Sequence, residues 1–358
     1  MNHSDPVSNH GADHAFRSGT DHADAPSQAP SFLREGGSDD RPGAGMHVRI
    51  ATRGSELALT QARSVAAQLA ALGASTEVVL VETAGDRSTA PFSAMPGTGF
   101  FTKAVQQAVL DGRADLAVHS HKDLPSAPVD GLEIAAVPTR ADPRDVLVVR
   151  PEVHDPSEGT WLPLHRGARV GTSAARRRHQ LGFHRPDLEL RELRGNVPTR
   201  LARLDGEELD AVVLAAAGLE RLGLDLGDLV VVPLDPRVFV PAPAQGALAL
   251  EARRAAADTD LTALLTRLHD VAGYATVAAE RGLMGMLQGG CQLALGAHAV
   301  AGPSGGLTLY AYYEGRTVCV DGRTAEEAAV LAFEALGRPA PASAAAPPVR
   351  VARPGSPR

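Results

Sequence analysis

From Val48 onward the chain alternates short apolar runs with amphipathic stretches, and this alternation constrains the fold more than any other feature. Short apolar runs bounded by polar residues are typical of buried strands, and apolar positions at helical spacing are typical of helices. Strands that alternate with helices usually pair into mostly parallel sheets. The sequence therefore predicts an α/β fold with mostly parallel sheets.

The same pattern occurs twice and is followed by a different one. The first part is expected to have strands at 48–52, 77–82, 115–119 and 132–136 and helices at 55–71 and 101–111. The second is expected to have strands at 146–149, 169–171, 188–193 and 211–214 and helices at 174–183, 197–205 and 216–222. A helix from about Asp270 and strands near Ala297, Leu307 and Thr317 predict a smaller α+β part.

Charged and proline-rich segments mark where the chain passes between the two similar parts. Residues 140–145 form the first crossing, and 233–243 form the second. Two crossings predict two hinged, periplasmic-binding-protein-like α/β domains with a cleft between them. The expected limits are a disordered tail at 1–45, domain 1 at 46–142 with a return segment at 243–265, domain 2 at 143–240, domain 3 at 268–337 and a disordered tail at 338–358.

Composition argues against several classes of protein. The formal net charge of −7 gives no indication of a nucleic-acid partner. No apolar run is long enough to cross a bilayer, and residues 1–45 lack the apolar segment of a secretory signal, so we expect a cytoplasmic protein without a membrane partner. The tail histidines are irregularly spaced and have no cysteine beside them, so no metal site is expected.

The segment 115–125 breaks from apolar to polar residues just before Pro125. It delivers Lys122 and Asp123 to the end of a predicted strand, and ligands of open α/β sheets bind at the carboxyl ends of strands. Only two of the 35 basic residues, Lys103 and Lys122, are lysines. A lysine here suggests a compact point charge, although a solvated surface ion pair is the alternative.

Arginines are concentrated in the second part of the chain, where residues 165–205 hold ten arginines and four acidic residues. Arg176, Arg177, Arg194 and Arg200 lie near predicted helix starts, where free backbone N–H groups already favour anions. Guanidinium groups bind carboxylates through paired hydrogen bonds. We therefore predict a cleft for a polyanion, and we expect the remaining members of the cluster to be solvated surface residues, namely Arg178, Arg185, Arg191 and Arg203.

The two cysteines, Cys291 and Cys319, are too few for a disulfide framework. Cys319 lies in an alternating run and is predicted to be a small core residue. Cys291 follows Gly289 and Gly290, which permit a tight turn with an exposed thiol. A purely structural role for Cys291 remains the alternative.

Taken together, these motifs identify a family. From about residue 48 to 298 the chain resembles the porphobilinogen deaminases, also called hydroxymethylbilane synthases. The resemblance is carried, in order, by residues 50–55, 83–86, 117–125, 142–145, 170–173, 193–197, 217–223, 245–247 and 289–291. The chain departs from residues common in the family at Thr98, Ala104, Ala244 and Gln288.

The resemblance implies a monomeric transferase of tetrapyrrole biosynthesis. Such an enzyme condenses four porphobilinogen molecules, with loss of ammonia, into linear hydroxymethylbilane, so its partners are porphobilinogen and the growing polypyrrole chain. It also implies a dipyrromethane cofactor joined by a thioether to Cys291 and contacted by Lys122 and Asp123, with Asp123 as the catalytic carboxylate. The implied substrate-binding residues are Arg53, Ser55, Lys122, Ser173, Arg176, Arg177, Arg194, Arg200, Arg221 and Gln245.

Two other functions fit parts of the pattern. A hinged anion receptor would use the arginine-lined cleft but has no need of Asp123 or Cys291. A cysteine hydrolase would use Cys291, but the sequence offers no convincing base and orienting partner for it. We expect His119 and His121 to supply hydrogen bonds and leave them outside the catalytic set.

Overall fold

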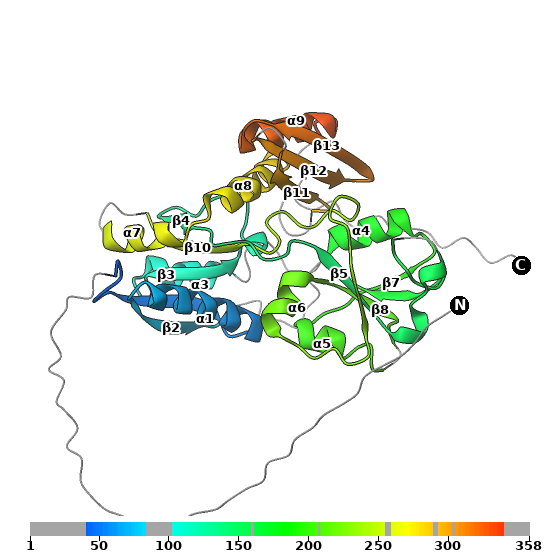
Figure 1. The fold of residues 1–358 in the computed structure, drawn as a ribbon, viewed down its shortest axis with the longest axis horizontal. Helices are drawn as coiled ribbons and strands as arrows, with labels where there is room; N and C mark the ends of the chain where they lie inside the picture. Colours follow the sequence, from blue (N-terminus) through cyan, green and yellow to red (C-terminus); the bar gives the residue numbers. More distant parts are fainter. Residues whose placement is uncertain are drawn as a thin grey trace, which may run out of the picture. The chain divides into compact units, whose positions relative to one another are not determined.

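The computed structural model describes residues 41–83, 102–158, 161–206, 208–254, 259–288, 293–302 and 305–339. All of these described residues belong to one compact unit. Within the described residues this unit contains two five-stranded sheets and one three-stranded sheet (Figure 1). The predicted architecture of two α/β domains and a smaller α+β domain is confirmed.

The first sheet has the order β2-β1-β3-β10-β4. Its strands are β1 (His47–Arg53), β2 (Ser75–Val81), β3 (Leu116–Ser120), β4 (Leu132–Ala136) and β10 (Leu248–Arg253). Strand β1 is parallel to β2 and β3, whereas β10 is antiparallel to β3 and β4. We call this sheet and its helices lobe 1.

The helices of lobe 1 are α1 (Glu56–Ala71), α3 (Lys103–Leu110) and α7 (Thr259–Leu268). Successive residues of β1 point to opposite faces of the sheet, as a strand requires. Ile50 packs in one core with residues of α1 and α7, and Ala51 packs in another with residues of α3. Both faces of the sheet are therefore covered, which explains the almost continuous apolar runs in the sequence.

Lobe 2 repeats this plan with the order β7-β6-β8-β5-β9. Its strands are β5 (Asp145–Val149), β6 (Arg169–Gly171), β7 (Glu189–Arg191), β8 (Ala211–Ala215) and β9 (Val230–Pro233), and its helices are α4 (Ala175–His184), α5 (Val197–Leu201) and α6 (Ala216–Leu222). Strand β6 is parallel to β7 and β8, whereas β5 is antiparallel to β8 and β9.

The expectation of mostly parallel sheets was wrong in one respect, because both sheets are mixed. The antiparallel strands β5 and β10 are those that directly follow the two predicted crossings. A chain that arrives at the carboxyl ends of the parallel strands has to run back through the sheet in the opposite direction. The two crossings therefore account for the mixed pairing.

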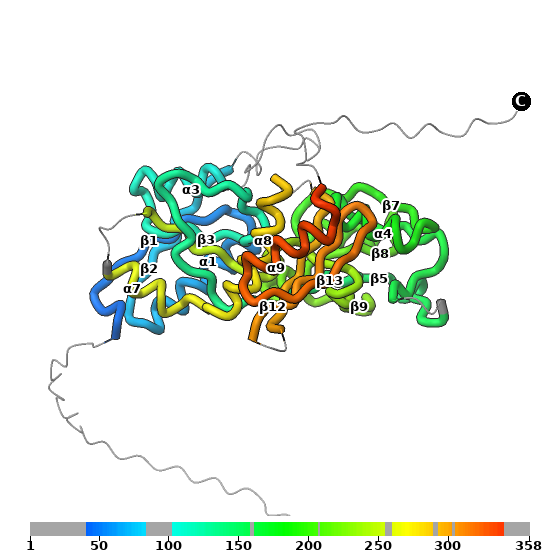
Figure 2. Tube along the Cα trace, turned by 90° about the horizontal axis from the view of Figure 1, so that it is seen from above, coloured from blue at the N-terminus to red at the C-terminus, as the bar shows by residue number. Residues whose placement is uncertain are grey.

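The third part contains α8 (Val271–Met286), the antiparallel strands β11 (Gly296–Ala301), β12 (Leu307–Tyr313) and β13 (Arg316–Gly322), and α9 (Ala325–Ala335). Both helices pack on the same face of the sheet, where Leu283, Leu309 and Ala332 share one core. Figure 2 shows α8 and α9 beside this sheet.

Some local predictions need correction. Strand β9 and helices α7 and α9 were not predicted, and α5 ends at Leu201 instead of 205. Cys319 is exposed because Val318 and Val320 are the residues of β13 that face the core. Arg185 is buried and donates to the carbonyls of Leu162 and Leu164 and to Asp187, so it is not a solvated surface residue. Among the described helices, none has the length and apolarity needed to cross a membrane.

Candidate active site

The predicted site residues follow the carboxyl ends of strands in both lobes. Arg53 ends β1, and Lys122 and Asp123 follow β3. Ser173 follows β6, and Arg194 comes after β7. This is the edge at which open α/β sheets bind ligands, so the sheet topology agrees with the location predicted from the sequence.

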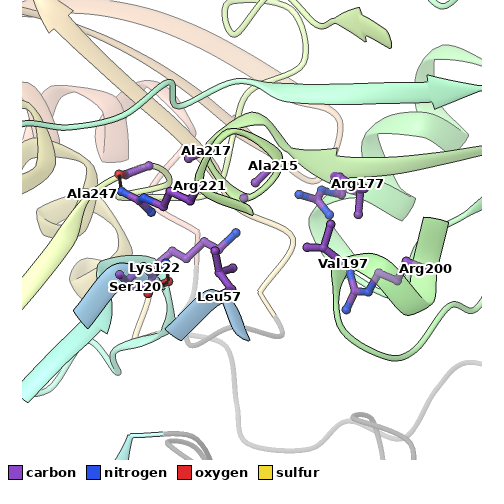
Figure 3. Close-up of a pocket in the computed structure, with 14 residues that line it drawn as sticks. Leu57, Ser120, Lys122, Arg177, Val197, Arg200, Ala215, Ala217, Arg221 and Ala247 are labelled. Atoms are coloured by element: carbon purple, nitrogen blue, oxygen red, sulfur yellow. Dashed lines mark hydrogen bonds between the residues drawn. The ribbon is translucent and has the colours of Figure 1, made fainter. Parts of the chain in front are cut away.

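A pocket of about 100 Å³ lies at this edge and is lined by both lobes. Its lining consists of Leu57, Gln61, Ser120, Lys122, Arg177, Val197, Arg200, Leu214, Ala215, Ala217, Gly218, Arg221, Gly246 and Ala247. Figure 3 shows the side chains of Lys122 and Arg177 extending toward each other from opposite sides. Among the described residues, four cations and no carboxylate line the pocket, which suits an anionic ligand.

Lys122 and Asp123 lie in a single 3-10 turn, His121–Asp123, that follows β3. The N–H of His121 donates to the carbonyl of Ala247 at 3.0 Å, and the N–H of Leu124 closes the turn on the carbonyl of His121 at 3.3 Å. Asp123 is exposed, whereas Lys122 is partly buried. Desolvation lowers the pKa of Lys122 to about 8, although the nearby Asp123 opposes the shift.

The Lys122 ammonium donates to Oε1 of Gln245 at 3.2 Å, and Nε2 of Gln245 donates to Oδ1 of Asp145 at 3.0 Å. Gln245 is buried, and the next residue, Gly246, has a φ of +87°. A Cβ at Gly246 would lie 2.4 Å from the carbonyl oxygen of Ala141, so only glycine fits there. This close approach of two crossing segments fixes the loop that holds Gln245 against Lys122.

Asp145 is the hub of the buried charges, and it was not among the site residues predicted from the sequence. Its carboxylate lies 2.7 Å from Nη2 of Arg176 and 2.7 Å from Nη2 of Arg177. Burial would raise the pKa of Asp145, but the two guanidinium groups outweigh burial and hold it below its ordinary value. The available signal was an acidic residue at the start of an otherwise apolar strand.

Arg200 and Arg221 line the pocket and have neutral hydrogen-bond partners. Nε of Arg200 donates to the carbonyl of Gly195 at 2.8 Å, and Nη2 of Arg221 donates to that of Gly246 at 2.7 Å. Burial and the neighbouring Arg177 lower the pKa of Arg200 to about 10, against the opposing effect of Asp123. Burial also lowers the pKa of Arg221.

Other predicted site residues lie outside the pocket lining. Arg176 is buried, pairs with Asp145 and donates to the carbonyl of Val240 at 2.9 Å. Ser55 caps α1 by accepting from the N–H of Ala58, and the Ser173 hydroxyl bonds both backbone groups of Leu193. Arg53 and Arg194 are partly exposed and also lie outside the lining. Gln245 is not part of the lining either, but its side chain accepts from the Lys122 ammonium.

The remaining predictions concern the cysteine and the family departures. Cys291 and Thr98 lie outside the described residues. Ala104 is a residue of α3 and packs, partly buried, against the core that contains Ala51. Ala244 and Gln288 adopt left-handed backbone conformations with φ of 62° and 48°. A glycine, which is common in the family at the position of Ala244, would adopt this conformation without strain.

Gln61 and Ser120 also line the pocket, although neither was predicted from the sequence, and their Nε2 and Oγ atoms lie 2.9 Å apart. Gln61 is only 3% exposed. A polar residue on the buried face of an amphipathic helix was the signal that could have found it. Its amide bonds the Ser120 hydroxyl, so both side chains add polar groups to the pocket lining that contains Lys122.

Comparison with known proteins gives consistent matches. The sequence profile described as "Porphobilinogen deaminase, dipyromethane cofactor binding domain" matches residues 48–261. The porphobilinogen deaminase of Mycobacterium avium is 49% identical over 253 residues, which cover 70% of this chain and 76% of the relative. That of Micrococcus luteus is 46% identical over 285 residues, covering 71% and 74%, and that of Cutibacterium acnes is 45% identical over 273 residues, covering 73% and 79%.

Proposed function

The chain belongs to the porphobilinogen deaminase family, and we propose that its cationic pocket is the place where porphobilinogen units are joined. The reaction condenses four porphobilinogen molecules, releases ammonia and yields hydroxymethylbilane for tetrapyrrole biosynthesis. The observation that carries this proposal is the pocket lining of Lys122, Arg177, Arg200 and Arg221 without a lining carboxylate among the described residues. Every pyrrole unit brings an acetate and a propionate, which such a lining can bind.

The pocket also suits the dipyrromethane cofactor for which the matching domain is named. Lys122, Arg200 and Arg221 are desolvated cations whose hydrogen-bond partners in the described part of the chain are neutral oxygens. Buried charges of this kind are stabilised by a ligand of opposite charge. Bound there, the cofactor supplies the pyrrole end to which substrate is added. We infer that Lys122 and Asp123 contact it and that the Cys291 thiol holds it through a thioether.

Asp123 is the proposed catalytic carboxylate. It is exposed at the turn beside Lys122, and its charge acts on Arg200 of the other lobe. Loss of ammonia from porphobilinogen leaves a cationic pyrrole, and the joined ring has to lose a proton. A carboxylate at the pyrrole nitrogens stabilises these cations and accepts or relays the proton, while the surrounding cations hold the carboxylates of the substrate.

The residues outside the lining support this site. Gln245 orients the ammonium of Lys122, and Arg176 shares Asp145 with Arg177. Ser173 holds the backbone of Leu193 next to Arg194. We propose that Arg53, Ser55, Ser173, Arg176, Arg194 and Gln245 complete the substrate-binding set around the growing chain.

The broader organisation is part of the same proposal. We propose domain limits of 46–142 with 243–265, of 143–240 and of 268–337. We also propose a cytoplasmic monomer that acts without nucleic acid or membrane; the four cations of the pocket lining all come from one chain, which supports the monomer. A hinged anion receptor is the rival function, and it predicts reversible ligand binding without covalent modification.

The first test is the intact mass of protein purified from cells that make porphobilinogen. The proposed enzyme carries the added mass of two pyrrole units and turns pink with an aldehyde reagent for pyrroles. Cys291→Ser abolishes both signals, whereas the control Cys319→Ser, which changes the exposed cysteine of β13, keeps both. An unmodified wild-type mass would favour the receptor.

The second test replaces the proposed catalytic carboxylate. Asp123→Asn is expected to keep substrate binding and to lower kcat by roughly a hundredfold to ten-thousandfold, the usual contribution of a general acid or base. Asp130→Asn is the control, because Asp130 is exposed on the same lobe and, among the described residues, accepts only from the N–H of Gly131. Turnover by Asp123→Asn equal to that of the control would remove Asp123 from the mechanism.

A further inference from the structure

Arg281, in the middle of α8, is bonded to the backbone of the turn that carries Lys122 and Asp123. Its Nη1 donates to the carbonyl oxygens of His121 at 3.2 Å and Leu124 at 3.3 Å. Its Nη2 donates to the carbonyl oxygen of Pro125 at 2.7 Å. One guanidinium group therefore contacts the backbone on both sides of Asp123 without contacting its carboxylate.

Buried His121 and Leu124 anchor the two ends of this turn, whereas Asp123 between them is exposed. A cavity of about 180 Å³ lies behind it, lined by residues 124–129 and by Arg281, Gln106 and Glu251, among others. The 3-10 turn has only three residues, and Asp123 is exposed, so packing of its side chain does not hold the backbone. The guanidinium group thus adds hydrogen bonds to the backbone where the Asp123 side chain provides no packing.

Helix α8, which carries Arg281, is held in place by the hydrogen bonds of the neighbouring residue, Glu280. The buried Glu280 carboxylate accepts from Arg140 at 2.8 and 2.9 Å and from the N–H groups of Ala244 and Ala299 at 2.6 and 2.8 Å. Nε of Arg140 donates to the carbonyl of Gln245 at 2.9 Å. Adjacent residues of α8 therefore bind the loop that holds Gln245 and the turn that holds Asp123.

Arginine is suited to this role by its shape and its charge. Burial lowers the pKa of Arg281, but Glu251 opposes the shift and the group stays protonated at any physiological pH. A planar guanidinium has donors directed in several fixed directions, so it can bridge three carbonyls that a single ammonium cannot reach together. The contact is thus a rigid link between α8 and the turn.

We propose that Arg281 is a positioning residue that fixes the Asp123 turn relative to α8. This proposal rests on the catalytic role proposed for Asp123. The link holds the turn of the proposed catalytic carboxylate against α8, which spans Val271–Met286. Small displacements of a catalytic group reduce the rate far more than they reduce ligand binding.

The test compares Arg281→Gln and Arg281→Lys with Arg253→Gln. Arg253 is a matched control because it also donates to two backbone carbonyls of lobe 1, those of Val109 and Ala114, away from the turn. The measurements on the cofactor-loaded proteins are kcat and KM, the melting temperature, and hydrogen–deuterium exchange of the peptide spanning the turn.

Arg281→Gln is expected to lower kcat by roughly tenfold to a hundredfold, with KM changed by less than about threefold. Exchange at the turn should rise in this variant and not in Arg253→Gln. Arg281→Lys should recover part of kcat, because lysine restores the charge and a hydrogen-bond donor but not the planar group with donors in several fixed directions. Recovery by lysine would distinguish positioning from a general loss of stability, even if Arg281→Gln folds poorly.

A kcat for both Arg281 variants within about twofold of that of Arg253→Gln would overturn the proposal. So would unchanged exchange at the turn in Arg281→Gln. These outcomes are separate from failure of the catalytic proposal, because that proposal fails only if Asp123→Asn retains turnover. An inactive Asp123→Asn together with a fully active Arg281→Gln would remove only the positioning role.

Discussion

The ammonium group of Lys122 donates a hydrogen bond of 3.2 Å to the side-chain oxygen of Gln245, 123 residues further along the chain. Gln245 in turn donates to Asp145, which holds Arg176 and Arg177. The hydrogen-bonded chain thus joins the cation of lobe 1 to those of lobe 2. Changes at any of its members should alter how the pocket holds carboxylates.

The depressed pKa of Lys122 predicts a pH dependence of substrate capture. Its pKa is lowered from 10.5 to about 8, and only the protonated form attracts a substrate carboxylate. We therefore expect kcat/KM, which reports the free enzyme, to fall as the pH rises through about 8. Lys122→Met should show a low kcat/KM without this decline, whereas Lys103→Arg should keep the wild-type profile. A decline that persists unchanged in Lys122→Met would contradict the assignment.

The same shift has the opposite effect on folding. Between pH of about 8 and 10.5 the unfolded chain binds more protons at Lys122 than the folded chain does. The free energy of unfolding attributable to this group should therefore increase as the pH rises across that interval. Urea denaturation over this range measures the increase in the free energy of unfolding. Lys122→Met should lack this increase, and Lys103→Arg should show it as the wild type does.

Asp145→Asn should strongly destabilise the protein. The change leaves the buried guanidinium groups of Arg176 and Arg177 without their counter-ion, which costs about 3–5 kcal/mol for a broken buried pair. Glu208→Gln breaks the exposed pair with Arg203 and should cost at most about 1 kcal/mol. Free energies of unfolding from urea titrations at neutral pH compare the two. Equal losses would show that Asp145 is not the hub of the charge cluster.

The depressed pKa of Asp145 adds a prediction about acid. The stability that this carboxylate contributes is present above its ordinary pKa of 3.8 and is lost as the pH falls through the lower folded value. Wild-type protein should therefore lose more stability below about pH 4 than Asp145→Asn does. Parallel losses in the two proteins would contradict this.

Arg200→Gln should separate substrate binding from stability. Arg200 is desolvated beside Arg177, so its charge is unfavourable until an anion binds. We expect KM to rise by roughly tenfold to a hundredfold, as for loss of a hydrogen bond to a charged group, while the melting temperature of the substrate-free protein does not fall. Arg203→Gln, which alters an exposed arginine of the same segment, is the control for KM. A lower melting temperature with an unchanged KM would assign Arg200 a structural role.

His119 and His121 should respond differently to replacement by methionine. Nε2 of His119 lies 3.0 Å from the buried Glu251 carboxylate but without hydrogen-bond geometry, and that carboxylate keeps its bonds from Gln106. His119→Met therefore removes a close polar neighbour and should cost about 1 kcal/mol of stability. Neither ring nitrogen of His121 has a hydrogen-bond partner among the described residues, although the side chain is buried. His121→Met should therefore preserve or raise the free energy of unfolding and retain turnover. Chemical denaturation of both variants checks the contrast.

The predictions made from local pattern were largely confirmed because they depend on neighbouring residues. Apolar periodicity indicated β1, β4 and α6, and the polar break after β3 indicated the position of Lys122 and Asp123. The order of the motifs identified the family. These features are encoded within short segments, where side-chain periodicity and turn residues determine the structure directly.

Only the tertiary structure decided which members of the motifs face the pocket. Arg176 and Arg177 are neighbours in sequence, but adjacent residues of a helix point in different directions, and only Arg177 lines the pocket. Asp145, Gln61 and Arg281 gained roles through partners far away in the sequence. Cys319 faces solvent because α8 and α9 cover the opposite face of the sheet, to which Val318 and Val320 point. Sequence determined the supply of charges at the strand ends, and long-range packing decided which of them were neutralised inside the protein and which were left for a ligand.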